Sequence, residues 1–384
     1  MTMNNQGTKT EATKMFIMRH IWNERLVQGD RIPSVAQLRS KLGVGNLTIS
    51  AAMQRLQAEG VIEIRDKVGV FVADPMAGGL KGPNIGMVSG KIEGNAFVSF
   101  LNTYMAKGFS DKDCTTTWFC LRPEAYGQTY NSIDEIDHLY YTVLSGKLDG
   151  IISLELLDAE AENFLQQHNI LLVYVGGYVP EQNHICIDYA HIFSQSFAHA
   201  AAAGFVRPAV VVQTHCDWME KACSQEMPKF FPSNRYFPLE NCRANCRQWA
   251  ESKEREIWRN NLISGWLALQ ETERPDILII PDDVLALQIG LELLARGKWM
   301  PWMLVLRNKD FDLPGFSNTP GFSDHILGEW VMDIKKFADF IVTNFTNILR
   351  AESQAESLPF LGFRPEYRFV HKLNPIRNDH IDIT

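Results

Sequence analysis

One group of side chains suited to contacting another molecule lies within residues 26–72. Ile49, Ala52, Met53 and Leu56 are spaced as the buried face of a helix. The outward face then carries Leu47, Thr48, Ser50, Ala51, Gln54 and Arg55. Side chains of these kinds on an exposed helix can bond or pack against the edges of DNA bases.

A second group consists of polar and aromatic residues that follow short apolar runs. Its members are Asn95, Phe97, Glu155, Trp218 and Asp282. Carboxylates and amides can bond the hydroxyl groups of a small ligand, and Trp218 can stack on a pyranose or a base. Asp282 and Asp283 follow the run DILIIP and open a helix, where a carboxylate is favoured by the helix N-terminus. The alternatives are that Asp282 is a plain N-cap and that Trp218 only packs in the core.

Residues 34–72 have the order helix, turn, helix, hairpin. Ser34 and Gln37 form the S-x-x-Q pattern of a capping box, and Gly43 can end the first helix. The second helix is expected to begin near Asn46, as N-cap, and to close at Gly60. The β-prone runs VIEI and VGVFV follow. These are the parts needed to put one helix in a major groove and a loop beside it.

This stretch resembles the GntR-family DNA-binding domain. The matching positions are Gly29, Ile32-Pro33-Ser34, Leu38, Gly43-Val44, Thr48 and Leu56 through Gly60. The chain departs from the family pattern at Gln37, Gly45-Asn46, Ser50 and Lys67-Val68-Gly69-Val70, so several arginines and the usual wing are replaced. The alternative is a winged helix used only for protein contacts.

The resemblance and the pattern together nominate ten DNA-binding residues. Asn46, Thr48 and Ser50 are expected in the major groove, and Arg31 and Lys67 on phosphates. The full set is Arg31, Ser34, Gln37, Asn46, Leu47, Thr48, Ser50, Arg55, Lys67 and Gly69. Residues 1–73 carry a net charge of +4 and the remainder −12, an asymmetry expected when only one end meets phosphate.

The sequence pattern beyond residue 73 is typical of an α/β protein. Residues 74–83, DPMAGGLKGP, read as a linker, which gives domains at 1–73 and 84–384. Strands are expected at 84–89, 115–121, 149–154, 170–176, 184–188, 208–213, 276–281 and 303–307. Helical patterns cover 131–146, 158–168, 190–203, 243–270, 283–297 and 332–350. Apolar strands alternating with helices predict parallel sheets.

Residues 144–153, 168–205 and 274–297 resemble the effector domain of the LacI family. That resemblance implies a two-lobed, periplasmic-binding-protein-like fold with a ligand cleft. The implied first lobe is about 84–188 plus a returning helix near 325–350, and the second about 189–310 plus a strand near 366–371. After MLVLR the family usually has Gly-Phe/Tyr-Asp-Asp, but this chain has Asn308-Lys309-Asp310.

These observations predict a cytoplasmic, bacterial-type transcription regulator. It would bind operator DNA as a homodimer, most simply as a repressor, and respond to a sugar or related metabolite. The alternative is an effector-binding protein whose winged helix has lost specific DNA binding. Seven cysteines without C-x-x-C pairs and ten scattered histidines give no metal-ligand spacing. We find no G-x-S-x-G, Walker or H-E-x-x-H motif, signal peptide or membrane-length apolar run, and expect no enzyme, cofactor or metal.

Overall fold

The computed structural model describes residues 5–24, 26–73, 82–90, 96–125, 130–176, 183–213, 217–232, 243–244, 252–297, 299–310, 313, 315–350 and 360–370. Contacts divide the chain into two compact units. The first consists of Met1–Lys91, Met105–Val173 and Val342–Glu356, and the second of Ile92–Tyr104, Tyr174–Ile341 and Ser357–Thr384. Of the expected linker, residues 74–81 lie outside the described part of the chain.

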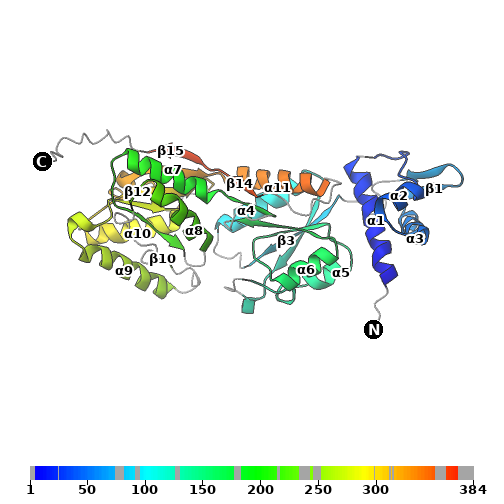
Figure 1. Cartoon of the computed structure of the whole chain (residues 1–384), viewed down its shortest axis with the longest axis horizontal. Helices are drawn as coiled ribbons and strands as arrows, with labels where there is room; N and C mark the ends of the chain where they lie inside the picture. The colour runs from blue at the N-terminus through cyan, green and yellow to red at the C-terminus, as the bar shows by residue number, and fades with distance from the viewer. Residues whose placement is uncertain are drawn as a thin grey trace. The chain divides into compact units, whose positions relative to one another are not determined.

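The N-terminal part of the first unit is a winged helix-turn-helix (Figure 1). Its elements are α1 (Asn5–Asn23), α2 (Val35–Leu42), α3 (Asn46–Ala58), β1 (Ile62–Arg65) and β2 (Gly69–Val72). The capping box at Ser34 and Gln37 is confirmed, and Gly43 adopts φ 63° at the end of α2. Strand β1 pairs antiparallel with β2 to form the wing.

Helix α1 packs in the apolar core of this domain, which the sequence pattern did not predict. Ile17 and Ile21 of α1 pack in one cluster with Leu38 of α2 and with Ile49 and Leu56 of α3. Burying side chains of this size stabilises the domain by about 1.5–3 kcal/mol each. The orientation of α3 is therefore set by apolar contacts on its inner face.

Helix α1 also reaches the start of β5 (Gly150–Ser153) through a charged contact in the first unit. Arg19 Nε donates to Asp149 Oδ1 at 3.0 Å, and its Nη2 donates to the Asp149 carbonyl oxygen at 3.0 Å. The Asp149 side chain is only 5% exposed and also accepts from the Asn84 amide at 2.8 Å. Removing Arg19 would thus leave a buried carboxylate with fewer partners, which is costly.

A six-stranded sheet follows in the order β14-β7-β6-β5-β3-β4. Its strands are β3 (Asn84–Ser89), β4 (Thr115–Cys120), β5, β6 (Leu171–Gly176), β7 (His184–Ile187) and β14 (Leu361–Phe363). The described pairings in it are parallel. Every residue of β5 and β7 is buried, as expected for parallel strands covered on both faces.

A second, five-stranded sheet has the order β15-β13-β12-β11-β8. Its strands are β8 (Pro208–Val210), β11 (Ile277–Ile280), β12 (Trp302–Asn308), β13 (Ile326–Met332) and β15 (Glu366–Phe369). All of its pairings are parallel except β13 with β15. Two short strands, β9 (Val212–Gln213) and β10 (Arg243–Ala244), pair parallel as a separate two-stranded sheet.

Helices cover both faces of the five-stranded sheet. Leu278 and Ile280 pack with α9 (Ser252–Ala268) and α10 (Asp283–Arg296). The alternate residues Ile277 and Ile279 pack with α7 (Tyr189–Ala202) and α8 (Asp217–Glu226). This alternation follows from the two-residue period of a strand and gives three layers.

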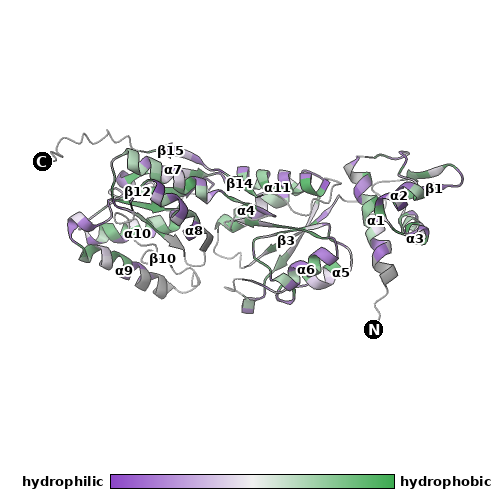
Figure 2. Cartoon of the chain, viewed as in Figure 1, coloured by the Kyte–Doolittle hydropathy of each residue, from purple (hydrophilic) through white to green (hydrophobic). Residues whose placement is uncertain are grey.

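The remaining helices are α4 (Ala96–Ser110), α5 (Leu139–Leu144), α6 (Ala159–Gln167) and α11 (Ile334–Arg350). Hydrophilic and hydrophobic residues form alternating bands along α11 (Figure 2). Phe345 of its C-terminal part contacts the Phe109 ring edge-on at 5.7 Å in the first unit. Short 3-10 turns occupy Pro123–Ala125, Ile133–Glu135, Met227–Lys229, Glu271–Glu273 and Ser323–His325.

The α/β class and all eight expected strands are confirmed, with the 208–213 run divided between β8 and β9. Three expectations were wrong. Residues 326–332 of the expected returning helix form the buried strand β13, because a run such as ILGEWVM suits a strand as well as a helix. Only Leu139–Leu144 of the 131–146 pattern is α-helical, and the 243–270 helix begins at Ser252. Helices and strands that were not expected include α1, α4, α8, β10 and β14.

Replacing Gly290 of α10 by Ala is expected to lower the free energy of unfolding by about 1–3 kcal/mol, the usual cost of overpacking. A methyl group there would meet the ring of Phe322, which is fully buried. Gly265→Ala in α9 is the matched control, because nothing lies within 4 Å of its methyl position. Chemical denaturation compares the two. Equal stability of both variants would contradict the packing of α10.

Candidate functional site

The outward face of α3 is the first candidate site. Leu47 is 79% exposed, and Asn46, Ser50 and Gln54 are also exposed. Two expectations about α3 were wrong. Thr48 is only 9% exposed, because it turns toward the inner face, and Gly45 rather than Asn46 is the N-cap.

The start of α3 has no side-chain cap, since Gly45 has no side chain to offer. The Thr48 amide of the first turn donates to the Gly45 carbonyl oxygen at 3.1 Å. A helix N-terminus favours an anion such as phosphate. By contrast, Ser34 and Gln37 are committed to α2. The Ser34 amide donates to Gln37 Oε1 at 2.8 Å, and the Gln37 amide donates to Ser34 Oγ at 3.3 Å. Both side chains remain exposed, so DNA contacts by them stay predictions.

Arg31 is hydrogen-bonded to the backbone of the wing near its tip. Its Nη2 donates to the Val68 carbonyl oxygen at 3.2 Å. Gly69 has φ 144°, and a Cβ there would lie 3.0 Å from Arg31 Nε. Lys67, at the tip, has φ 60° and an exposed side chain. The glycine thus allows the close approach of the guanidinium, and Lys67 is left for solvent or a phosphate.

Arg55, one of the expected DNA-binding residues, and Arg65 both have ion-pair partners within the domain. Arg55 Nη1 donates to Glu11 Oε2 of α1 at 2.9 Å. Arg65 Nη2 lies 2.8 Å from Glu63 Oε2, and its guanidinium sits 4.6 Å from the Phe71 ring centroid. The hydrogen bond from Arg65 lowers the pKa of Glu63, while the same bond raises the pKa of Arg65. Such exposed pairs are weak and can open on contact with phosphate.

Glu155 is a candidate ligand group in the first unit, beyond the end of β5. Its Oε1 accepts from the Gly90 amide at 2.9 Å, just past the end of β3. Burial raises the pKa of Glu155 despite this hydrogen bond. Ser89 directly precedes Gly90. Its hydroxyl is buried and has no hydrogen-bond partner among the described residues. Sequence reasoning missed Ser89, although its place at a strand end was a usable signal.

Asp282 and Asp283 lie in the second unit, after β11. Asp282 is the N-cap of α10 and accepts from the Leu285 amide at 2.7 Å. Asp283 is 4% exposed and accepts from both the amide and the Nδ2 of Asn308, each at 2.9 Å. Burial raises the pKa of Asp283, although these bonds oppose it. Asp283 therefore ties the ends of β11 and β12 together, while Asp282 caps the helix.

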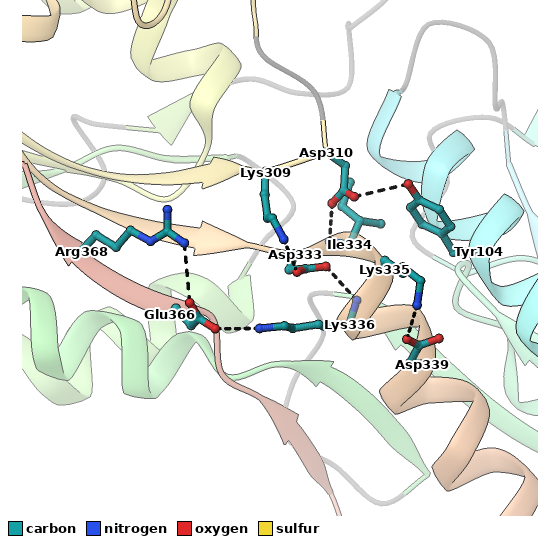
Figure 3. Close-up of polar contacts among 10 residues, drawn as sticks. All are labelled: Tyr104, Lys309, Asp310, Asp333, Ile334, Lys335, Lys336, Asp339, Glu366 and Arg368. Carbon is teal, nitrogen blue, oxygen red and sulfur yellow. Dashed lines mark hydrogen bonds and ion pairs between the residues drawn. The ribbon is translucent and has the colours of Figure 1, made fainter.

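A polar cluster surrounds the start of α11 in the second unit (Figure 3). Asp310, beyond β12, accepts from the Ile334 amide at 2.7 Å and from the Tyr104 hydroxyl at 3.4 Å. Lys309 Nζ donates to Asp333 at 2.9 Å. Burial raises the pKa of Asp333, but the bonds from Lys309 and the Lys336 amide outweigh it and the pKa is lowered. Sequence reasoning did not propose Tyr104 or Asp333.

The remaining candidate ligand residues are placed only in part. Phe97 lies in the first turn of α4 and is half-buried. Trp218 lies in α8, but its side chain is outside the described part of the chain, as is Asn95 altogether. Within the described residues, no group of His, Cys, Asp and Glu could hold a metal ion. No helix described there is long and apolar enough to cross a membrane.

Residues 10–72 match the family model described as bacterial regulatory proteins, gntR family. An uncharacterized HTH-type transcriptional regulator of Bacillus subtilis, YhdI, is 36% identical over 64 residues, 17% of this chain and 14% of that protein. The HTH-type transcriptional regulator Rv0792c of Mycobacterium tuberculosis is 39% identical over 66 residues, 17% of this chain and 23% of that protein. The chain thus spans less than a quarter of these relatives, and the likeness lies in a GntR-type helix-turn-helix domain.

Solved structures show the fold of the chain beyond the winged helix. A LacI-family regulatory protein from Chloroflexus aggregans has TM-score 0.52 at 13% identity, covering 73% of this chain and 97% of that one. The transcriptional regulator CelR, solved with cellobiose, has TM-score 0.54 at 12% identity, covering 88% and 98%. The fold beyond the winged helix is therefore that of LacI-like, periplasmic-binding-protein-like regulators.

Glu155→Gln is expected to stabilise the native chain near neutral pH. A raised carboxyl pKa means that the native state binds the proton more tightly than the unfolded chain, so the charged group costs stability above that pKa. Gln keeps an oxygen for the Gly90 amide and removes the charge. Its advantage should shrink as the pH falls toward the ordinary Glu value of about 4.3.

Thermal denaturation from about pH 8 to pH 4 measures this difference. Glu256→Gln on α9 is the control, because that carboxylate is exposed and lies beyond the first turn of its helix. A Glu155→Gln protein less stable than wild type at neutral pH would show that the charge itself stabilises the fold.

Proposed function

We propose that this protein is a ligand-responsive transcription regulator. The observation that carries the proposal is the combination, in one chain, of a winged helix with an exposed α3 and a LacI-like α/β fold. In this proposal residues 1–73 bind operator DNA and residues 84–384 bind the effector. No catalytic step, metal or cofactor belongs to it.

The proposed assembly is a homodimer that acts as a repressor. Helix-turn-helix proteins bind paired half-sites, and a symmetric pair of half-sites needs two copies of the reading helix. A small molecule could then change the relative pose of two winged helices and so change operator affinity. That effect would require different effector affinities in the two poses.

The proposed effector is a sugar or a related metabolite. Support comes from CelR, whose structure of similar fold holds cellobiose. In this chain Glu155 and Asp282 follow β5 and β11, and the carboxyl ends of parallel strands are the usual place for a ligand in such folds. The proposed ligand-binding set also includes the amide of Asn95 and the aromatic rings of Phe97 and Trp218, which could stack on the ligand.

A second candidate function is effector binding without specific DNA recognition. The favouring observation is that Arg31, Arg55 and Arg65 all have partners inside the winged helix. Under that reading the domain would contact another protein.

The DNA proposal predicts that the full chain shifts a fragment from upstream of its own coding sequence. Lys67→Ala should weaken binding to every sequence and reduce the slope of log affinity against log salt by about one unit, since one phosphate contact is lost. Lys107→Ala on α4 is the control, because that exposed lysine pairs with Asp111, just past the end of the helix. Absence of specific binding at low salt would remove the regulator proposal and favour the second candidate.

The effector proposal predicts that a screen of sugars finds a ligand that raises the melting temperature, because it binds only the native state. Asp282→Asn keeps the cap oxygen and should weaken that ligand at least about tenfold, or about 1.4 kcal/mol. Asp276→Asn is the control, because Asp276 bonds backbone amides at the opposite end of β11. Unchanged affinity of the Asp282 variant in calorimetry would show that this carboxylate is only a cap.

A further inference from the structure

The outward face of α3 is almost without charge. The only charged residue within the helix is Arg55, and its guanidinium is bonded to Glu11 of α1. Leu47, Ser50, Ala51 and Gln54 follow the i, i+3, i+4, i+7 spacing of one helix face. Leu47, Ser50 and Gln54 are exposed and Ala51 is half-exposed. This face therefore presents to a nucleic acid the methyl groups of Leu47 and Ala51, the hydroxyl of Ser50 and the amide of Gln54.

The chemistry of such a face selects among base pairs. Guanine is read in the major groove mainly by Arg or Lys, which bond its O6 and N7. Thymine is read by apolar contact with its C5-methyl group, and adenine by the paired donor and acceptor of an Asn or Gln amide. Leu47 is 79% exposed, in the first turn of the reading helix, where base contacts are commonly made.

We propose that α3 reads A·T base pairs, with Leu47 against a thymine methyl and Gln54 on an adenine edge about three base-pair steps away. This inference rests on the proposed DNA-binding function and adds the class of sequence that is recognised. Leu47 and Gln54 are seven residues apart, which is about 10 Å along a helix. That length covers about three base-pair steps of about 3.4 Å. Ser50 and Ala51 face the steps between them, and a small apolar contact suits a thymine methyl there too.

The first experiment is selection of duplexes from a random library by the full-length chain. Enriched half-sites should carry A·T pairs over about four consecutive positions at the centre of the α3 footprint. Invariant guanines at those positions would overturn the inference. Failure to enrich any sequence would instead overturn the proposed function, so the two failures are distinct.

The second experiment is a double-mutant cycle between Leu47 and the thymine methyl. Replacing thymine by deoxyuridine removes only that methyl, and wild-type affinity should fall about fourfold for each substituted half-site, the value of burying one methyl-sized group. Leu47→Ala should bind the thymine duplex correspondingly less tightly and lose all further sensitivity to deoxyuridine. Non-additivity of this kind reports a direct contact.

Leu144→Ala, at an exposed leucine of α5, is the matched control and should keep the wild-type response to deoxyuridine. A parallel cycle pairs Gln54→Ala with 7-deazaadenine, which lacks the N7 acceptor. If Leu47→Ala and wild type lose the same factor on deoxyuridine, Leu47 does not touch the methyl group and the assignment is wrong. Anisotropy titrations at fixed salt supply all of these affinities.

Discussion

The burial of parallel strands on both faces is the constraint on which the larger part of this structure depends. Strands such as β5, β7 and β11 have no exposed residue, so polar side chains can appear only where the strands end. Glu155, Asp188, Asp282 and Asp310 all follow strand ends. Each accepts from a backbone amide, at Gly90, His191, Leu285 and Ile334 respectively. The same geometry that builds the sheets therefore concentrates carboxylates where a polar ligand is proposed to bind.

A different constraint governs the winged helix, which is too small to bury charge. Its apolar cluster fixes the inner face of α3, and its ion pairs lie on the surface. Exposed pairs of that kind contribute little to stability. The ion pairs of Arg55 with Glu11 and of Arg65 with Glu63 are therefore not needed to hold the domain together. What α3 presents outward is then decided by Leu47, Ser50 and Gln54, which no packing requirement constrains.

The sequence predicted those parts of the molecule in which local chemistry and periodicity agree. The capping box at Ser34, the turn at Gly43 and helices α6, α7 and α10 are examples. It failed where tertiary contacts decide, as at ILGEWVM, whose apolar run becomes β13 because neighbouring strands pair with it. It missed α1, whose apolar residues matter only once α3 lies against them. For the site, Asp282 at a strand end was visible in the pattern, whereas the inward turn of Thr48 and the engagement of Arg55 by Glu11 needed the structure.

In the proposed function, one chain couples operator binding to small-molecule binding. Linkage between two sites is reciprocal, so the factor by which ligand changes operator affinity must equal the factor by which operator changes ligand affinity. The direct measurement is calorimetry of the ligand found by thermal shift, with and without saturating operator duplex, alongside anisotropy of the duplex with and without ligand. We expect two equal factors of about 5–150, the usual range of such coupling. Two factors of one, with both molecules bound, would contradict it.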